Sequence, residues 1–170
     1  MFAKTPAQRL APIAAFAALV WLAGCAALAP GGLPLGAPIA QARASLFGPT
    51  GEYALPGGGT RLEFAQGAFG KQTYMLDFDK SGVLIASQQV LTELNLATIE
   101  PGLPADELRR RFGRPAWVFG VRQPRAHIWN YRFDGGDCVW YQVSVDDASQ
   151  TVIDASIGTD PACDGPNRRE

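Results

Sequence analysis

The sequence predicts an α+β fold of two repeats, each with short helices followed by a three-stranded antiparallel meander, the helices packed on the sheet. Three observations support this prediction. Residues 99–133 read as a helix with well-defined ends, then a turn and a strand. The same order of landmarks recurs 65 to 67 residues upstream. Runs of strand-forming residues are separated by short turns rich in Asp and Gly.

The helix expected at residues 104–112 has favourable residues at both ends. Pro104 suits the first helical position, where its missing N–H costs nothing. Two acidic residues follow in the first turn, and three arginines at 109–111 fill the last, so both ends complement the helix dipole. Gly113 can adopt the left-handed conformation that ends a helix.

The upstream copy is weaker but keeps its landmarks in order. Phe47 and Gly48 precede Phe112 and Gly113 by 65 residues, and Tyr74 precedes its counterpart Tyr141 by 67. Two copies do not make a solenoid, yet they indicate a duplicated unit. The alternative is chance, because Gly, Pro and Phe are common in this chain.

Each repeat is expected to begin with a helical segment and a loop. The first helical segment, residues 36–48, is weakly amphipathic through Ile39, Ala42 and Leu46. Residues 91–97 fit a short helix, or could instead prolong the preceding strand. Residues 49–59 and 114–125 are expected to be loops. The strands are expected at residues 60–65, 72–78, 83–86, 126–134, 138–146 and 151–157.

The N-terminal segment has the features of an export signal. Lys4 and Arg9 precede an apolar run at residues 10–22, which is short for a membrane span. The run ends in Leu-Ala-Gly-Cys, a tetrapeptide that resembles a bacterial lipobox. The resemblance implies a signal peptide at residues 1–24 and lipidation of Cys25. With Ala rather than Asp after the cysteine, analogy with other lipoproteins points to the outer membrane.

The mature chain would begin at Cys25 and carry a small negative net charge. It holds 13 basic and 16 acidic residues, a balance that gives no indication of nucleic-acid binding. Its expected segments are a flexible Pro- and Gly-rich tether at 25–35, a first repeat at 36–90, a second repeat at 91–158 and a polar tail at 159–170.

The sequence offers no catalytic site, metal site or cofactor motif. His127 is the only histidine, so a multi-histidine metal site is excluded, and its place in an expected strand favours a structural role. Neither a Gly-x-Ser-x-Gly elbow nor a phosphate-binding glycine loop occurs. The carboxylate pairs at 77 and 79 and at 146 and 147 lie where turns are expected, which favours solvated turns over acid–base chemistry.

Two cysteines remain after Cys25, and an exported protein meets an oxidising compartment. If the last hairpin pairs Val145 with Val152, Cys138 lies opposite Thr159 and close to Cys163. A disulfide between Cys138 and Cys163 is therefore expected to pin the tail to the sheet.

Arginines and aromatic residues gather around the second helix and the segment after it. Seven of the 13 mature basic residues lie between 109 and 132, interleaved with two tryptophans, a phenylalanine and a tyrosine. Both types are enriched at binding hot spots. The alternative is structural: the arginines lie on a solvated helix face, and the aromatic residues pack in the core. A partner- or lipid-binding set is predicted on the loop 114–125, comprising Arg114, Trp117, Phe119, Arg122 and Arg125.

The order of these features resembles a known family. Pro-Gly, a short helix, Phe-Gly-Arg-Pro, Trp-Asn-Tyr and a Val-x-Val-Asp strand are similar to the BamE (SmpA/OmlA) outer-membrane lipoproteins. The resemblance covers residues 99–157 best and is weak over 36–88. It implies a helix pair on a three-stranded sheet and a role with the β-barrel assembly machine. A tandem copy is also similar to the β-lactamase inhibitor protein fold.

These features together predict a non-catalytic, lipid-anchored scaffold or assembly factor on the periplasmic face of the outer membrane. The expected partners are the membrane, through Cys25, and an envelope protein such as the assembly machine. Anionic lipid headgroups are a further expected ligand, whose binding should weaken with salt. The main alternative is an inhibitor of a periplasmic enzyme, and a weaker one is a cell-wall or lipid hydrolase.

Overall fold

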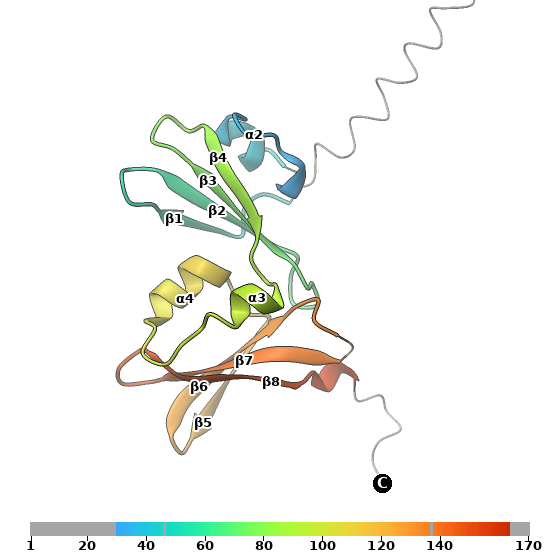
Figure 1. Ribbon diagram of the computed structural model, residues 1–170, viewed down its shortest axis with the longest axis vertical. Helices are drawn as coiled ribbons and strands as arrows, with labels where there is room; N and C mark the ends of the chain where they lie inside the picture. Colours follow the sequence, from blue (N-terminus) through green and yellow to red (C-terminus); the bar gives the residue numbers. More distant parts are fainter. Residues whose placement is uncertain (1–29, 46, 137, 164–170) are drawn as a thin grey trace, which may run out of the picture.

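The computed structural model describes residues 30–45, 47–136 and 138–163 (Figure 1). They form two units, unit 1 at residues 30–89 and unit 2 at residues 93–163, each with one four-stranded antiparallel sheet. Unit 1 contains η2 (Pro30–Gly32), α2 (Ile39–Arg43), β1 (Gly51–Ala54), β2 (Thr60–Ala65), β3 (Thr73–Phe78) and β4 (Leu84–Gln89). Unit 2 contains α3 (Glu93–Leu96), α4 (Ala105–Phe112), β5 (Trp117–Arg122), β6 (Arg125–Arg132), β7 (Val139–Asp146), β8 (Val152–Thr159) and η3 (Pro161–Cys163).

Each sheet has one strand more than predicted. The orders are β1-β2-β3-β4 in sheet 1 and β5-β6-β7-β8 in sheet 2, so the expected three-stranded meanders are wrong by one strand each. The extra strands, β1 and β5, lie in the two stretches predicted to be loops. Both are edge strands, and both contain or adjoin glycine or proline, which are depleted in strands. The six predicted strands are all present, and β2 has the predicted bounds.

The two units have the same strand order, and equivalent backbone hydrogen bonds form within each of them. The N–H of Gly36 donates to the carbonyl of Leu84, and the N–H of Gly102 donates to the carbonyl of Val152, both at 2.8 Å. A register shift interrupts the pairing of the last two strands at matching places in both sheets. The prediction of two similar units is thus confirmed in their backbones.

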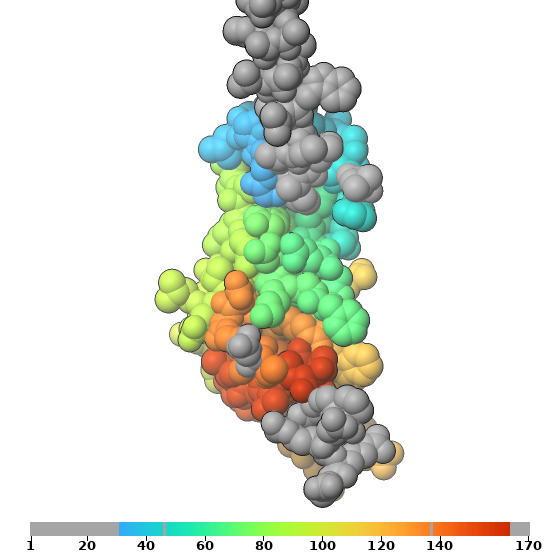
Figure 2. Space-filling view, turned by 90° about the vertical axis from the view of Figure 1, so that its right-hand side faces the viewer, coloured from blue at the N-terminus to red at the C-terminus, as the bar shows by residue number. Residues whose placement is uncertain are grey.

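Helices and sheets alternate along the long axis of the molecule, in the order α2, sheet 1, α3 with α4, and sheet 2 (Figure 1). Figure 2 shows unit 1, in blue and green, stacked on unit 2, in orange and red. The unit 1 core contains Leu33, Ala37, Ala42, Leu62, Phe64, Leu76, Phe78 and Leu84. The unit 2 core contains, among others, Leu96, Leu108, Phe112, Tyr131, Phe133, Tyr141 and Val143, and it includes Met75 from unit 1. The two units therefore share buried apolar surface.

The described chain begins within the segment expected to be a tether. Leu33 is buried in the unit 1 core, so the residues just before Gly36 belong to the fold. Cys25, the signal peptide and Leu46 lie outside the described residues. Within the described part, none of the helices is long and apolar enough to cross a membrane.

The predicted disulfide between Cys138 and Cys163 is present, with their Cα atoms 5.5 Å apart. Val145 pairs with Val152, but a register shift that leaves Ile153 of β8 unpaired places Val139 rather than Cys138 opposite Thr159. Cys138 therefore lies next to Asp160, one residue beyond Thr159, and its carbonyl accepts a hydrogen bond from the N–H of Asp160 at 2.8 Å. The bond closes the end of β8 and η3 against the start of β7.

Candidate functional site: the seam between the units and the open face of sheet 2

Each sheet has an inner face, which carries the helices of its own unit, and an outer face. Because directly paired residues of an antiparallel sheet lie on the same face, the register identifies the outer-face residues. In sheet 1 the edge pairs on this face are Gly51 with Glu63 and Tyr53 with Arg61. The equivalent pairs in sheet 2 are Trp117 with Asn130 and Phe119 with Ile128.

The outer face of sheet 1 is covered by unit 2, and we call this contact the seam. Met75 lies on this face and is buried in the unit 2 core together with Leu108 and Phe112 of α4. Tyr53 packs against the same cluster. The seam is therefore a packed contact between the units and not a flexible connection.

Glu63 is the most buried charged residue of the seam, with 1 % of its surface exposed. Its carboxylate accepts hydrogen bonds from the hydroxyls of Thr50, at 2.9 Å, and Tyr53, at 2.6 Å. It also accepts the backbone N–H of Arg114, at 3.2 Å, from unit 2. Burial, followed by the bond to Glu63, raises the pKa of Tyr53 far above its usual value, so this hydroxyl remains a donor. These bonds compensate the cost of burying the carboxylate.

A second contact across the seam centres on Arg61. Its guanidinium forms a fork with the Asp77 carboxylate at 2.6 and 2.7 Å, and this bonding raises the pKa of Arg61. A third hydrogen bond runs from Arg61 to the carbonyl of Arg110 in the last turn of α4, at 3.0 Å. The last carbonyls of a helix lack intrahelical partners, so Arg61 satisfies one of them from the other unit.

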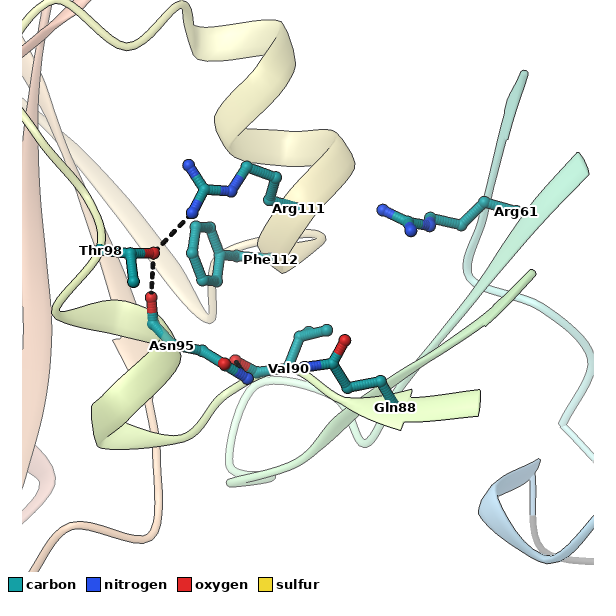
Figure 3. A pocket seen from close by; sticks show the side chains of 7 residues that line it. All are labelled: Arg61, Gln88, Val90, Asn95, Thr98, Arg111 and Phe112. Atoms are coloured by element: carbon teal, nitrogen blue, oxygen red, sulfur yellow. Dashed lines mark hydrogen bonds between the residues drawn. The ribbon is translucent and has the colours of Figure 1, made fainter. Parts of the chain in front are cut away.

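A cavity of about 260 Å³ opens beside this contact (Figure 3). Arg61 enters it from β2, and Arg111 of α4 reaches toward Thr98 at the opposite side. One Arg111 nitrogen donates to the Thr98 hydroxyl at 2.5 Å, and that hydroxyl donates to the carbonyl of Asn95 at 2.6 Å. The lining residues are Arg61, Gln88, Val90, Asn95, Thr98, Arg111 and Phe112.

Arg132 links the units a third time, at the other end of the sheets. It pairs with the Asp160 carboxylate, which is only 6 % exposed, and donates to the carbonyl of Ala68 in unit 1. Its guanidinium also lies 5.0 Å from the ring centroid of Phe69 and 5.6 Å from that of Trp140. The Arg132 bonds are the first cause of the lowered pKa of Asp160.

The residues predicted to form one binding set lie at three places. Trp117 and Phe119 lie on the outer face of sheet 2, with 59 and 38 % of their surface exposed. Arg122 and Arg125 pair at the tip of the hairpin, on the inner-face side of the strands. Arg114 is exposed beside a second cavity of about 230 Å³ near Arg132. Five residue steps, or about 17 Å, separate Trp117 from Arg122 along β5.

The groups considered for chemistry are each bonded to a neighbouring side chain. The prediction that Asp77 lies in a solvated turn is wrong, because Asp77 lies within β3 and is half-buried in its fork with Arg61. His127 is exposed on β6, and its Nδ1 lies 2.6 Å from an Asp147 carboxylate oxygen. Asp79 and Asp146 accept hydrogen bonds from the serines of their own turns, which lower the pKa of both carboxyls. Among the described residues, no group of three His, Cys, Asp or Glu side chains is placed to hold a metal ion.

Comparison with known proteins gives no family. No family model matches the sequence, and no curated protein sequence is significantly similar to it. A crystal structure of a cysteine-rich secretory protein from Staphylococcus aureus aligns with a TM-score of 0.29 and 13 % identity. The alignment covers 77 % of this chain and 46 % of that one.

The seam residues are the part of the site that the sequence reasoning missed. In β2, Glu63 reads as an ordinary outward-facing polar residue, and Arg61 as a solvated one. Aligning the two repeats places Glu63 at the position of Asn130, and both are buried. In the sequence, however, a polar residue at an outward strand position does not distinguish a covered face from a solvated one.

Proposed function

We propose that this protein is a lipid-anchored, non-catalytic binding protein of the cell envelope, a scaffold or assembly factor resembling the BamE lipoproteins. The lipobox-like tetrapeptide ending at Cys25 supports the anchor and the outer-membrane location. The similarity of residues 99–157 to the BamE pattern supports the assembly role. The proposal assigns the protein no reaction and no cofactor.

One observation carries the binding role. The outer face of sheet 1 is covered by α4, whereas Figure 1 shows no α-helix of the described chain on the outer face of sheet 2. This face is exposed around Trp117 and Phe119, and it is closed at Trp140 and Arg132, where Arg132 reaches unit 1. On this open face Trp117 stands where sheet 1 has Gly51, and Phe119 stands where it has Tyr53. Large exposed aromatic side chains on an uncovered sheet face mark an interaction surface.

The position of the open face favours a protein partner over the headgroups of the anchoring membrane. Pro30 begins the described chain beside unit 1, and the β5–β6 hairpin lies at the opposite end of the molecule (Figure 1). Only five residue steps separate Cys25 from Pro30, a span of at most about 17 Å. A lipid on Cys25 would therefore hold unit 1 near the membrane, with sheet 2 at the distal end.

The test is a capture experiment from solubilised envelopes with matched surface variants. We expect Trp117→Ser with Phe119→Ser to abolish capture of the partner, and Leu94→Ser to leave it unchanged. Leu94 is a suitable control because it is 85 % exposed on α3 of the same unit. Equal capture by both variants, with circular dichroism unchanged, would refute the binding face. Subunits of the barrel assembly machine in the eluate would support the assembly role.

Localisation is tested separately. Replacing Cys25 by alanine should move the protein from the outer-membrane fraction to the soluble periplasm. Sedimentation of that variant with outer membranes would refute the anchor. Replacing Arg122 and Arg125 together by glutamine should weaken binding to anionic vesicles if headgroups are a ligand, and should leave capture of a partner on the outer face unchanged.

The alternative function is inhibition of a periplasmic enzyme. The tandem arrangement of two similar sheets favours it, because the β-lactamase inhibitor protein fold is also a tandem repeat. A single periplasmic enzyme in the eluate, inhibited by the wild type and not by the Trp117 and Phe119 variant, would establish this alternative instead.

A further inference from the structure

We propose that the cavity between Arg61 and Arg111 binds a small oxyanionic group, a phosphate or a carboxylate. This inference goes beyond the proposed function, because the cavity lies in the seam and shares no residue with the open face of sheet 2. It rests on the charges that line the cavity, on how the two arginines are held, and on the size of the space.

The two arginines of the cavity differ in how their charges are balanced. Arg61 is neutralised by its fork with Asp77. Arg111 is held by the Thr98 hydroxyl, a neutral group, and no carboxylate of the described chain lies within salt-bridge distance of it. The cavity wall therefore carries one positive charge without a counter-ion, and its lining contains no acidic residue.

Arg111 is also fixed in place before any ligand arrives. Thr98 holds one guanidinium nitrogen, and Thr98 is itself fixed through the carbonyl of Asn95 (Figure 3). The guanidinium lies 5.1 Å from the centroid of the neighbouring Phe112 ring. A cation held in this way loses little side-chain entropy when it binds an anion, which favours affinity. Its remaining N–H groups suit the paired oxygens of a phosphate or carboxylate.

The other polar groups and the size of the cavity fit a small ligand. Gln88 brings a side-chain amide to the lining, and amides donate hydrogen bonds to oxyanions. Asn95 also lines the cavity, but its amide nitrogen already donates to the carbonyls of Gln89 and Val90. The volume of about 260 Å³ lies below the range of about 300 to 1,000 Å³ that is usual for drug-sized ligands. The cavity is thus sized for a single anionic group, either free or at the end of a longer molecule.

The ligand would bridge the units. Arg61 and Gln88 belong to unit 1, and Arg111, Asn95 and Thr98 belong to unit 2. An anion bound to both walls adds a contact to the seam, so binding should raise the melting temperature by mass action.

The test is calorimetric titration of the whole chain with inorganic phosphate and, in a parallel experiment, with succinate as a carboxylate ligand. We expect saturable one-to-one binding with a dissociation constant of about 1 mM, weakened by salt. Arg111→Gln should weaken it at least about tenfold, which corresponds to about 1.4 kcal/mol. Arg110→Gln should change it less than about twofold, because Arg110 pairs with Glu107 outside the cavity lining.

A second variant keeps the test decisive if Arg111→Gln perturbs the fold. Gln88→Glu places a negative charge on the cavity wall at an exposed edge-strand position, where the fold should tolerate it, and should abolish binding. Vesicles containing phosphatidylglycerol distinguish the source, because Arg111-dependent binding to them identifies a lipid headgroup, whereas binding of free phosphate alone identifies a soluble ligand. Absence of saturable binding to wild type, or equal binding by wild type and Gln88→Glu, would overturn the proposal.

Discussion

The outer faces of the two sheets differ far more than their backbones do. Gly51 in sheet 1 is half-buried beside Glu63, and a Cβ atom there would lie 2.8 Å from a carboxylate oxygen of Glu63. Trp117, the largest side chain, occupies the equivalent place in sheet 2 and is largely exposed. The covered face of sheet 1 thus holds a glycine and a buried carboxylate at positions where sheet 2 holds an exposed tryptophan and a buried asparagine.

The largest effect is expected from removal of the Glu63 carboxylate, which has no counterpart in unit 2. Glu63→Ala should lower the free energy of unfolding by about 4 kcal/mol, because Tyr53 and the N–H of Arg114 each lose a charged acceptor. Glu52→Ala is the control, since its ion pair with Arg43 is exposed and should cost less than about 1 kcal/mol. Urea denaturation measures both. Equal small losses would mean that the seam does not depend on Glu63.

The disulfide is the next asymmetry, because both of its cysteines belong to unit 2. Cys163→Ser together with Cys138→Ser should lower the free energy of unfolding by about 3 kcal/mol, as the chain-entropy model gives for a separation of 25 residues. Thermal unfolding with and without reductant checks this. A wild type that reductant does not destabilise would contradict the prediction.

A smaller effect is expected at the Arg132 link. Asp160→Asn should cost about 2 kcal/mol near neutral pH, because a charge-assisted fork is weakened. The folded protein holds the pKa of Asp160 below its unfolded value, so the stabilisation is present above about pH 4 and is lost as the pH falls through the folded pKa. In Asp160→Asn, this part of the loss of stability at acid pH should be absent.

The control for this link is Asp134→Asn, measured by urea titrations across the acid range. Asp134 approaches Lys71 of the other unit at 3.9 Å but is 81 % exposed, so its removal should change the free energy of unfolding little at any pH. If Asp134→Asn changed the dependence of unfolding free energy on pH as much as Asp160→Asn does, burial of the ion pair would not explain the stabilisation.

The smallest predicted effect concerns a turn that both units share. Gly82 in unit 1 has φ of 78°, and Gln150 at the matching place in unit 2 has φ of 55°. Gly82→Ala should cost about 1 to 2 kcal/mol, because alanine pays the left-handed penalty and its Cβ would lie 3.1 Å from Ile39. Gly120→Ala, where the nearest atom is 3.8 Å away, should be close to neutral by the same urea titration.

Local pattern was sufficient for most of the fold. The alternation in residues 60–65 predicted β2 with its observed bounds, and the hairpin between Val145 and Val152, on which the disulfide prediction was conditional, is present. β1 and β5 were missed because glycine or proline lies within or beside them and weakens the strand pattern. In β5 the glycine at 120 and the surrounding arginines favoured a loop.

The site could be predicted less well than the fold, because its contacts join residues far apart in sequence. Glu63 and Arg114 are 51 residues apart, and Arg132 and Ala68 are 64 apart. No periodicity encodes such pairs. Trp117 and Phe119 were predicted to form one binding set with Arg122 and Arg125 on a loop. Their separation from these arginines depends on strand alternation, which a loop prediction does not contain.

The open face of sheet 2 can also be understood in the terms used for repeat proteins. A stack of repeats has two ends, and a soluble array closes each with a polar capping element. At one end of this molecule α2 covers sheet 1, and α4 continues the stack into unit 2. At the other end, the described chain supplies no third helix layer. A partner that docks on Trp117 and Phe119 would act as the missing cap, and the stack would end in a second protein.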